Sequence, residues 1–127
     1  NVTGCRIAVL GLTFKPNTDD MRDAPSIDII SFLQGAGAEI SAYDPAGMSV
    51  AKNLLENINW GDSAYSVVEG ASALVIMTEW NEFRALDLER LKRLMIQPII
   101  VDLKNIYRPI EMEEAGMRYI SVGRPKN

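Results

Sequence analysis

The residues best suited to bind a ligand lie in one polar segment, residues 11–22, which follows an apolar run. The segment contains one aromatic ring, two cations and two adjacent carboxylates, provided by Phe14, Lys15, Arg22, Asp19 and Asp20. Lys15 stands between Phe14 and Pro16, two residues that stiffen the loop around it. Two interpretations of Lys15 stay open, namely contact with an anionic ligand and an ordinary solvated surface position.

The acidic part of this segment has a structural interpretation. Acids just before a helix favour the helix N-terminus, and Arg22 can hold the loop by pairing with an acid such as Asp20. We therefore assign Asp20 and Arg22 a loop-structuring role rather than a catalytic one. A second small cationic site is predicted at Lys104, which follows a later apolar run and lies between Asp102 and Arg108.

No catalytic set of side chains is complete in this sequence. The chain has no histidine, which excludes histidine-based triads and imidazole metal sites. We predict neither a catalytic residue nor a metal site. The single cysteine, Cys5, precedes the first expected strand, at the end of the sheet opposite the loops, so a nucleophilic role is not assigned to it. One cysteine excludes an internal disulfide and agrees with a reducing, cytoplasmic compartment.

Strands and helices alternate along the chain. We expect strands at residues 6–10, 38–43, 58–60, 73–77, 98–101 and 118–122, and helices at about 25–34, 48–55, 65–69, 86–95 and 110–115. This alternation is typical of a parallel sheet with helices on both faces, and right-handed crossovers leave few topologies. We predict an α/β fold, a Rossmann-like doubly wound parallel sheet of five to six strands in the order 3-2-1-4-5-6.

This strand order places the ligand crevice between the first and fourth strands, at their carboxyl ends. Residues 11–22 then lie beside the end of the fourth strand, and Lys104 lies one strand further on. The first turn has one glycine, Gly11, instead of the G-x-G-x-x-G motif that lets a backbone close on a pyrophosphate. Asp44 stands where a dinucleotide-binding acid would, but Tyr43-Asp44-Pro45 is also a good turn, which we favour.

Composition limits the class of protein. A chain of 127 residues suits a single domain over residues 1–127, with a flexible tail expected at 123–127. The formal net charge of −4 argues against nucleic-acid binding, and no apolar run approaches the length of a membrane span. The sequence lacks an initial Met and leads almost directly into a strand, so we expect a domain excised from a longer protein.

Nearly the whole chain resembles the C-terminal, UDP-binding domain of the UDP-glucose/GDP-mannose dehydrogenases, beginning with GLTFKPNTDDMRDAPS at residues 11–26. Shorter matches follow in the family's order and spacing: YDP at 43–45, TEWNEF at 78–83 and DLKN at 102–105. The resemblance implies that Phe14 and Lys15 contact a UDP-sugar. It implies the same for Lys104, at a position where the family commonly has arginine, whose planar set of donors lysine lacks.

The resemblance further implies an N-terminal NAD-binding domain and a long central helix outside these residues. NAD is then expected on that other domain and no cofactor on this one, while the catalytic cysteine lies in the remainder. The full-length enzyme is expected to be a homo-oligomer that oxidises UDP-glucose at C6 to UDP-glucuronate in two NAD-dependent steps.

Three alternatives remain open. The first is a dehydrogenase of another UDP-hexose in the same family. The second is a free-standing dinucleotide-binding module, which the lone Gly11 disfavours. The third is a phosphoacceptor signalling domain, suggested by Asp19-Asp20, Thr78 and Lys104 at strand ends, although the acid pair lies well beyond the end of the first strand.

Overall fold

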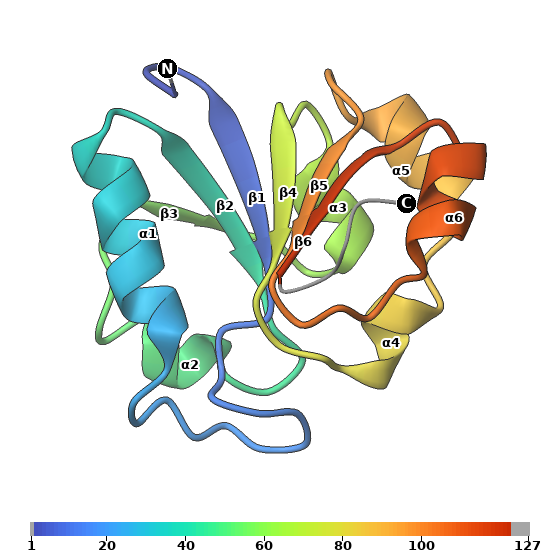
Figure 1. Ribbon diagram of the computed structural model, residues 1–127. Helices are drawn as coiled ribbons and strands as arrows, with labels where there is room; N and C mark the ends of the chain where they lie inside the picture. Colours follow the sequence, from blue (N-terminus) through green and yellow to red (C-terminus); the bar gives the residue numbers. More distant parts are fainter. Residues whose placement is uncertain (1, 123–127) are drawn as a thin grey trace.

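The computed structural model describes residues 2–122, so the tail expected at 123–127 lies outside the described residues. Its strands form one parallel sheet in the order β3-β2-β1-β4-β5-β6 (Figure 1). The predicted α/β class and strand order are therefore confirmed. The strands are β1 (Arg6–Leu10), β2 (Glu39–Tyr43), β3 (Ile58–Trp60), β4 (Ala73–Ile76), β5 (Ile99–Asp102) and β6 (Arg118–Ser121).

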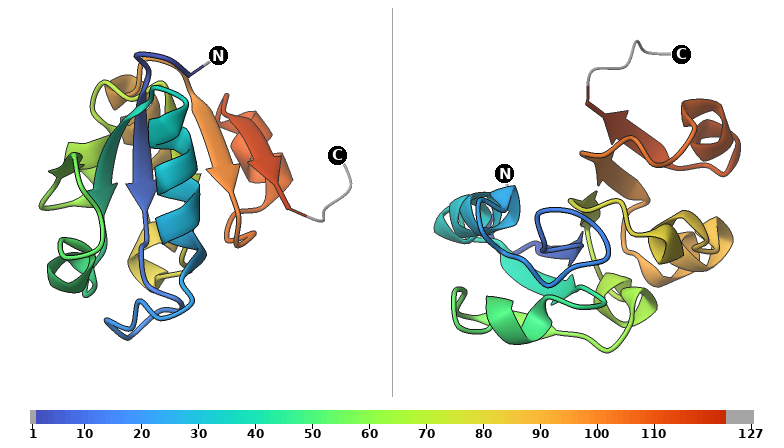
Figure 2. Two further views of the ribbon diagram at one scale, coloured as in Figure 1. Left: turned by 90° about the vertical axis from the view of Figure 1, so that its left-hand side faces the viewer. Right: turned by 90° about the horizontal axis from the view of Figure 1, so that it is seen from below.

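Helices connect these strands on both sides of the sheet, with α1 on one side and α3, α5 and α6 on the other (Figure 2). The helices are α1 (Pro25–Gly35), α2 (Met48–Ala51), α3 (Ala64–Val68), α4 (Asn81–Arg84), α5 (Leu88–Leu94) and α6 (Pro109–Glu114). No helix in the described part of the chain is long and apolar enough to cross a membrane.

Two expected helices differ from the structure for local reasons. The helix expected at 48–55 ends at Ala51. After that residue the chain forms turns with hydrogen bonds between residues three positions apart, such as Asn53 N to Val50 O at 3.1 Å. The helix expected at 86–95 is shorter, and a separate helix, α4, precedes it. Its start is set by Asp87, whose carboxylate accepts the N–H groups of the first turn of α5.

Side chains alternate along the strands between two apolar cores, one on each face of the sheet. Leu74 and Ile76 of β4 face the core beneath α3, α5 and α6, whereas Val75 and Met77 face the core beneath α1 and α2. All four are buried, and this unbroken apolar run is what a central parallel strand requires. The two cores hold the carboxyl ends of the strands in one row, from which the ligand-binding candidates emerge.

Gly11 directly follows β1, near the centre of this row, and has a φ of 92°. A Cβ atom built there would lie 2.5 Å from the Thr78 side chain and 2.6 Å from the Thr78 backbone nitrogen. Both its backbone conformation and the close approach of the chain after β4 therefore require glycine.

Replacing Gly11 with alanine should lower the free energy of unfolding by more than about 2 kcal/mol. The added Cβ atom would overlap the backbone nitrogen of Thr78, which cannot shift without moving the chain that follows β4. Gly35→Ala is the matched control, since Gly35 is helical and a Cβ there meets nothing within 4 Å. That control should leave stability unchanged or raise it by up to about 1 kcal/mol. Urea unfolding of both variants measures the difference, and equal effects would contradict this account of Gly11.

Candidate functional site

Residues 11–22 form a loop, called here the 11–22 loop, that projects from the carboxyl edge of the sheet below the end of β1 (Figures 1 and 2). Phe14 and Lys15 are exposed on this loop, with 48% of Phe14 accessible. The residues before them, Leu12 and Thr13, are buried. The loop therefore has a buried base and an exposed tip that carries the aromatic ring and the cation.

The base of the loop is held by the carboxylate of Asp44, which is fully buried at the end of β2. Its oxygens accept hydrogen bonds from five donors: Leu12 N at 2.7 Å, Thr13 N at 3.2 Å, Ala46 N at 2.8 Å, Gly47 N at 2.7 Å and Trp80 Nε1 at 3.2 Å. Two of these donors belong to the turn after β2, which agrees with the turn interpretation of this residue. The other three belong to the chain after β1 and after β4, a role that the turn pattern does not reveal.

Two buried threonines complete the base of the loop. Thr78 Oγ1 donates to Thr13 O at 2.8 Å, and Thr13 Oγ1 donates to Lys15 O at 2.9 Å. Ser26 of α1 adds a third tie, because its hydroxyl donates to Leu12 O at 2.6 Å. The chain after β4, helix α1 and a bond within the loop itself thus fix the backbone that leads to Lys15. The sequence suggests Thr78 only for a phosphoacceptor site and indicates no role for Thr13, and the bond between them joins residues 65 positions apart.

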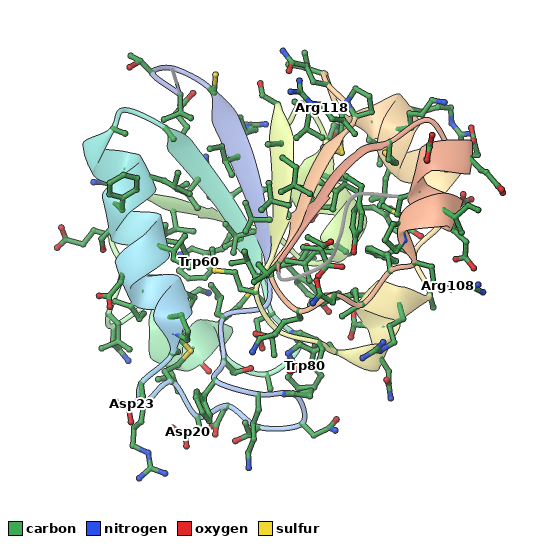
Figure 3. The ribbon with its side chains drawn as sticks, in the orientation of Figure 1. Asp20, Asp23, Trp60, Trp80, Arg108 and Arg118 are labelled. Carbon is green, nitrogen blue, oxygen red and sulfur yellow. The ribbon has the colours of Figure 1, made fainter. Side chains whose placement is uncertain are left out.

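The outer half of the loop is closed by Asp20 and Arg22. Arg22 donates to Asp20 from its backbone nitrogen at 2.9 Å and from Nε and one terminal nitrogen at 3.0 Å each. These side-chain hydrogen bonds, more than any other cause, lower the pKa of Asp20 to about 2. Phe14 N donates to Asp20 O at 3.0 Å, which joins the two halves of the loop. Figure 3 shows Asp20 at the lower edge of the molecule and Trp80 between the loop and the sheet.

Lys104 lies on the loop after β5, and a second buried carboxylate holds that loop. Asp102 Oδ1 accepts from Lys104 N at 3.0 Å. Its Oδ2 accepts from Ile106 N at 2.8 Å, Tyr107 N at 3.2 Å and the Tyr119 hydroxyl at 2.6 Å. Burial, followed by the charge of Asp102, raises the pKa of Tyr107 above its usual range. Only β4 separates β1 from β5, so Lys15 and Lys104 belong to loops on the same edge of the sheet.

Tyr43, the last residue of β2, connects this edge to α4. Its hydroxyl donates to Glu82 Oε2 at 3.1 Å, and its ring makes an edge contact with the buried ring of Phe83. Burial, followed by the hydrogen bond with Glu82, raises the pKa of Tyr43 to about 12. The tyrosine therefore stays neutral at physiological pH and serves as a hydrogen-bond donor.

The arrangement does not assemble a phosphoacceptor site. Asp20 is engaged by Arg22, and the buried Thr78 hydroxyl is used by Thr13. Within residues 2–122, no group of three or more His, Cys, Asp or Glu side chains could hold a metal ion. An open hollow of about 470 Å³ lies near the amino ends of β2 and β3, away from the loops described above, and is lined by Gln34, Ala38, Glu39, Asn57, Ile58 and Asn59.

Known proteins resemble this chain over almost its full length. UDP-glucose 6-dehydrogenase of Rhizobium meliloti is 55% identical over 125 residues, which cover 98% of this chain and 29% of that protein. The corresponding enzyme TuaD of Bacillus subtilis is 43% identical and is matched over 98% of this chain and 27% of its own length. The chain thus spans less than a third of the curated relatives that it matches.

Solved structures agree with the fold. A UDP-D-ManNAc dehydrogenase from Pyrococcus horikoshii superposes with a TM-score of 0.77 at 31% identity, over 97% of this chain and 26% of its own. An NDP-N-acetyl-D-galactosaminuronic acid dehydrogenase from Methanosarcina mazei superposes with a TM-score of 0.82 at 26% identity. The match covers 97% of this chain and 25% of that protein's chain. The model of the UDP-glucose/GDP-mannose dehydrogenase family, UDP binding domain, matches residues 8–109. The chain therefore belongs to the UDP-glucose/GDP-mannose dehydrogenase family, as its UDP-binding domain.

Proposed function

We propose that this chain is the UDP-sugar-binding domain of a longer, NAD-dependent UDP-glucose 6-dehydrogenase, which oxidises UDP-glucose at C6 to UDP-glucuronate. The observation that carries the proposal is the exposed pair Phe14 and Lys15 on a loop whose base is buried and hydrogen-bonded at the carboxyl edge of the sheet. A ligand meeting this edge finds an aromatic ring and a cation on a backbone that is already ordered.

The distribution of cations near this edge supports a diphosphate ligand. Because the chain carries a net charge of −4, an anion must be held by a few local cations rather than by the overall field. Arg22 is paired with Asp20 and Arg108 with Glu111. Lys15 and Lys104 form no ion pair within residues 2–122, so their charges are free to meet phosphate oxygens. We assign both lysines, together with Phe14, to UDP-sugar binding.

The same edge does not fit NAD. A single glycine follows β1, so the chain lacks the G-x-G-x-x-G motif that lets a backbone close on a pyrophosphate. Asp44, which would bind the ribose in a dinucleotide site, is buried and bonded to protein donors through both oxygens. We therefore place the NAD site, the central helix and the catalytic groups in parts of the protein beyond this domain, and assign no catalytic residue within it.

Other features of the full-length enzyme follow from the same proposal. The single cysteine suits a reducing compartment, and we place the enzyme in the cytoplasm. The family resemblance supports a homo-oligomer. A related substrate, UDP-N-acetylmannosamine, is the second candidate, because a dehydrogenase named for that sugar superposes with a TM-score of 0.77. The 55% identity with a UDP-glucose 6-dehydrogenase favours UDP-glucose.

Lys15→Ala in the full-length enzyme should lower kcat/KM for UDP-glucose by at least about tenfold, about 1.4 kcal/mol of transition-state stabilisation. The KM for NAD should stay unchanged, because Lys15 lies on a different domain from the cofactor. Arg93→Ala is the control, since Arg93 is an exposed cation on α5, near the amino edge of the sheet. Steady-state kinetics measure kcat/KM for UDP-glucose and the KM for NAD in both variants. If Lys15→Ala raised the KM for NAD and left kcat/KM for UDP-glucose unchanged, the proposal would be refuted.

Lys104 is tested by a pair of substitutions. Lys104→Arg should keep or tighten UDP-glucose binding, because arginine preserves the charge and adds a planar set of donors. Lys104→Ala should weaken binding by about 1.5–3 kcal/mol, the range for a hydrogen bond to a charged group. Calorimetric titration of the full-length protein with UDP-glucose measures both. Unchanged affinity of the alanine variant would place Lys104 outside the ligand contact.

A further inference from the structure

Lys15 owes its position to a residue that is itself too deeply buried to touch a ligand. We propose that Asp44 is a positioning residue for UDP-sugar binding, which sets where Lys15 lies through the buried base of the 11–22 loop. The inference rests on the proposed function, because it concerns the same site. It assigns to Asp44 a part in substrate recognition that neither a turn residue nor a ribose-binding acid would have.

The path from Asp44 to Lys15 consists of two successive hydrogen-bond steps. Asp44 Oδ2 accepts from Thr13 N at 3.2 Å, and the Thr13 hydroxyl donates to Lys15 O at 2.9 Å. That hydroxyl also lies 3.4 Å from Asp44 Oδ2, but the carbonyl of Lys15 is the closer acceptor. Asp44 and Thr13 are both buried, at 0% and 2% exposure, so solvent cannot replace these bonds readily.

The two oxygens of Asp44 accept hydrogen bonds from different parts of the chain. This difference distinguishes a role in positioning the 11–22 loop from a role in the turn alone. Oδ1 accepts from Ala46 N and Gly47 N, both in the turn that follows β2. Oδ2 accepts from Leu12 N at 2.7 Å, from Thr13 N and from the indole of Trp80. A turn alone needs only the first oxygen, as asparagine shows in many turns. The second oxygen is committed to the loop.

Packing around the carboxylate keeps the loop base in one place. A Cβ atom at Gly47 would lie 2.6 Å from Thr13 Cγ2, so the turn after β2 presses directly on the loop. Thr78 holds Thr13 O from the opposite side. With its base constrained from two strands, the loop presents Lys15 on a backbone that is already ordered before binding, and such preorganisation favours affinity.

The decisive variant is Asp44→Asn in the full-length enzyme. Asparagine keeps one oxygen for the turn but turns an amide donor toward the N–H groups of Leu12 and Thr13, leaving them unsatisfied. The Kd for UDP-glucose, measured by calorimetry, should rise about five- to twentyfold, because displaced binding groups lose affinity steeply. The KM for NAD should not change. Asp87→Asn is the matched control, since Asp87 also accepts two backbone N–H groups, but at the start of α5.

Asp44→Asn should lower the midpoint of thermal unfolding and raise the Kd, whereas Asp87→Asn should change neither, because its remaining side-chain oxygen still accepts both N–H groups at the start of α5. If the Asp44 variant does not fold, Thr13→Val decides the question, because it removes the hydroxyl and keeps the shape. Thr13→Val should raise the Kd about threefold or more, Thr13→Ser should restore it, and the effect should vanish in a Lys15→Ala background.

Failure of this inference is distinguishable from failure of the proposed function. If Lys15→Ala weakens UDP-glucose binding while folded Asp44→Asn and Thr13→Val leave the Kd unchanged, Asp44 is only structural and the proposed function stands. If Lys15→Ala itself leaves the Kd unchanged, both are wrong. A Thr13→Val effect that persists undiminished without the Lys15 side chain would also overturn the inference.

Discussion

Two buried carboxylates determine what the carboxyl edge of this sheet can do. Burying an ionised acid is costly unless protein donors replace its hydration, and Asp44 and Asp102 are both at 0% exposure. Asp44 accepts hydrogen bonds from five donors and Asp102 from four. Most of these donors are backbone N–H groups of the adjoining loops. The buried carboxylates must accept hydrogen bonds from these N–H groups, and this requirement gives the adjoining loops defined conformations.

The two acids occupy equivalent places in the two halves of the fold. Asp44 follows β2, the middle strand of β3-β2-β1, and Asp102 ends β5, the middle strand of β4-β5-β6. Each holds a loop that presents one lysine without an ion-pair partner among the described residues. Asp44 and Asp102 lie inside, and the two lysines lie on the loops after β1 and β5, the strands that flank β4. In the proposed function, these two lysines supply the local positive charge that a chain with a net charge of −4 needs to hold a diphosphate.

The strand order was predictable from the sequence because strand and helix alternation, together with right-handed crossovers, leaves few arrangements. The contacts that build the site were not, because they are non-local. Leu12 N and Asp44 are 32 residues apart, and the Thr78 hydroxyl reaches Thr13 across 65. The sequence at Asp44-Pro45 indicates a turn, and the structure contains it, but nothing local reveals that the second oxygen serves the loop after β1. Asp20 and Arg22, two residues apart, are recognisable because their interaction is local.

One structural difference explains why this Rossmann-like sheet carries a long polar loop after β1 where a dinucleotide site would lie. In a dinucleotide site, glycines after the first strand let the backbone close on a pyrophosphate, and the acid after the second strand points outward to a ribose. Here the glycines beyond Gly11 are replaced by bulkier residues, so the chain departs from the sheet as a long loop. The N–H groups at the base of that loop need an acceptor, and Asp44 turns inward to supply it. The lack of these glycines and the burial of Asp44 are thus linked, because the long loop after β1 supplies the N–H groups that the buried carboxylate accepts.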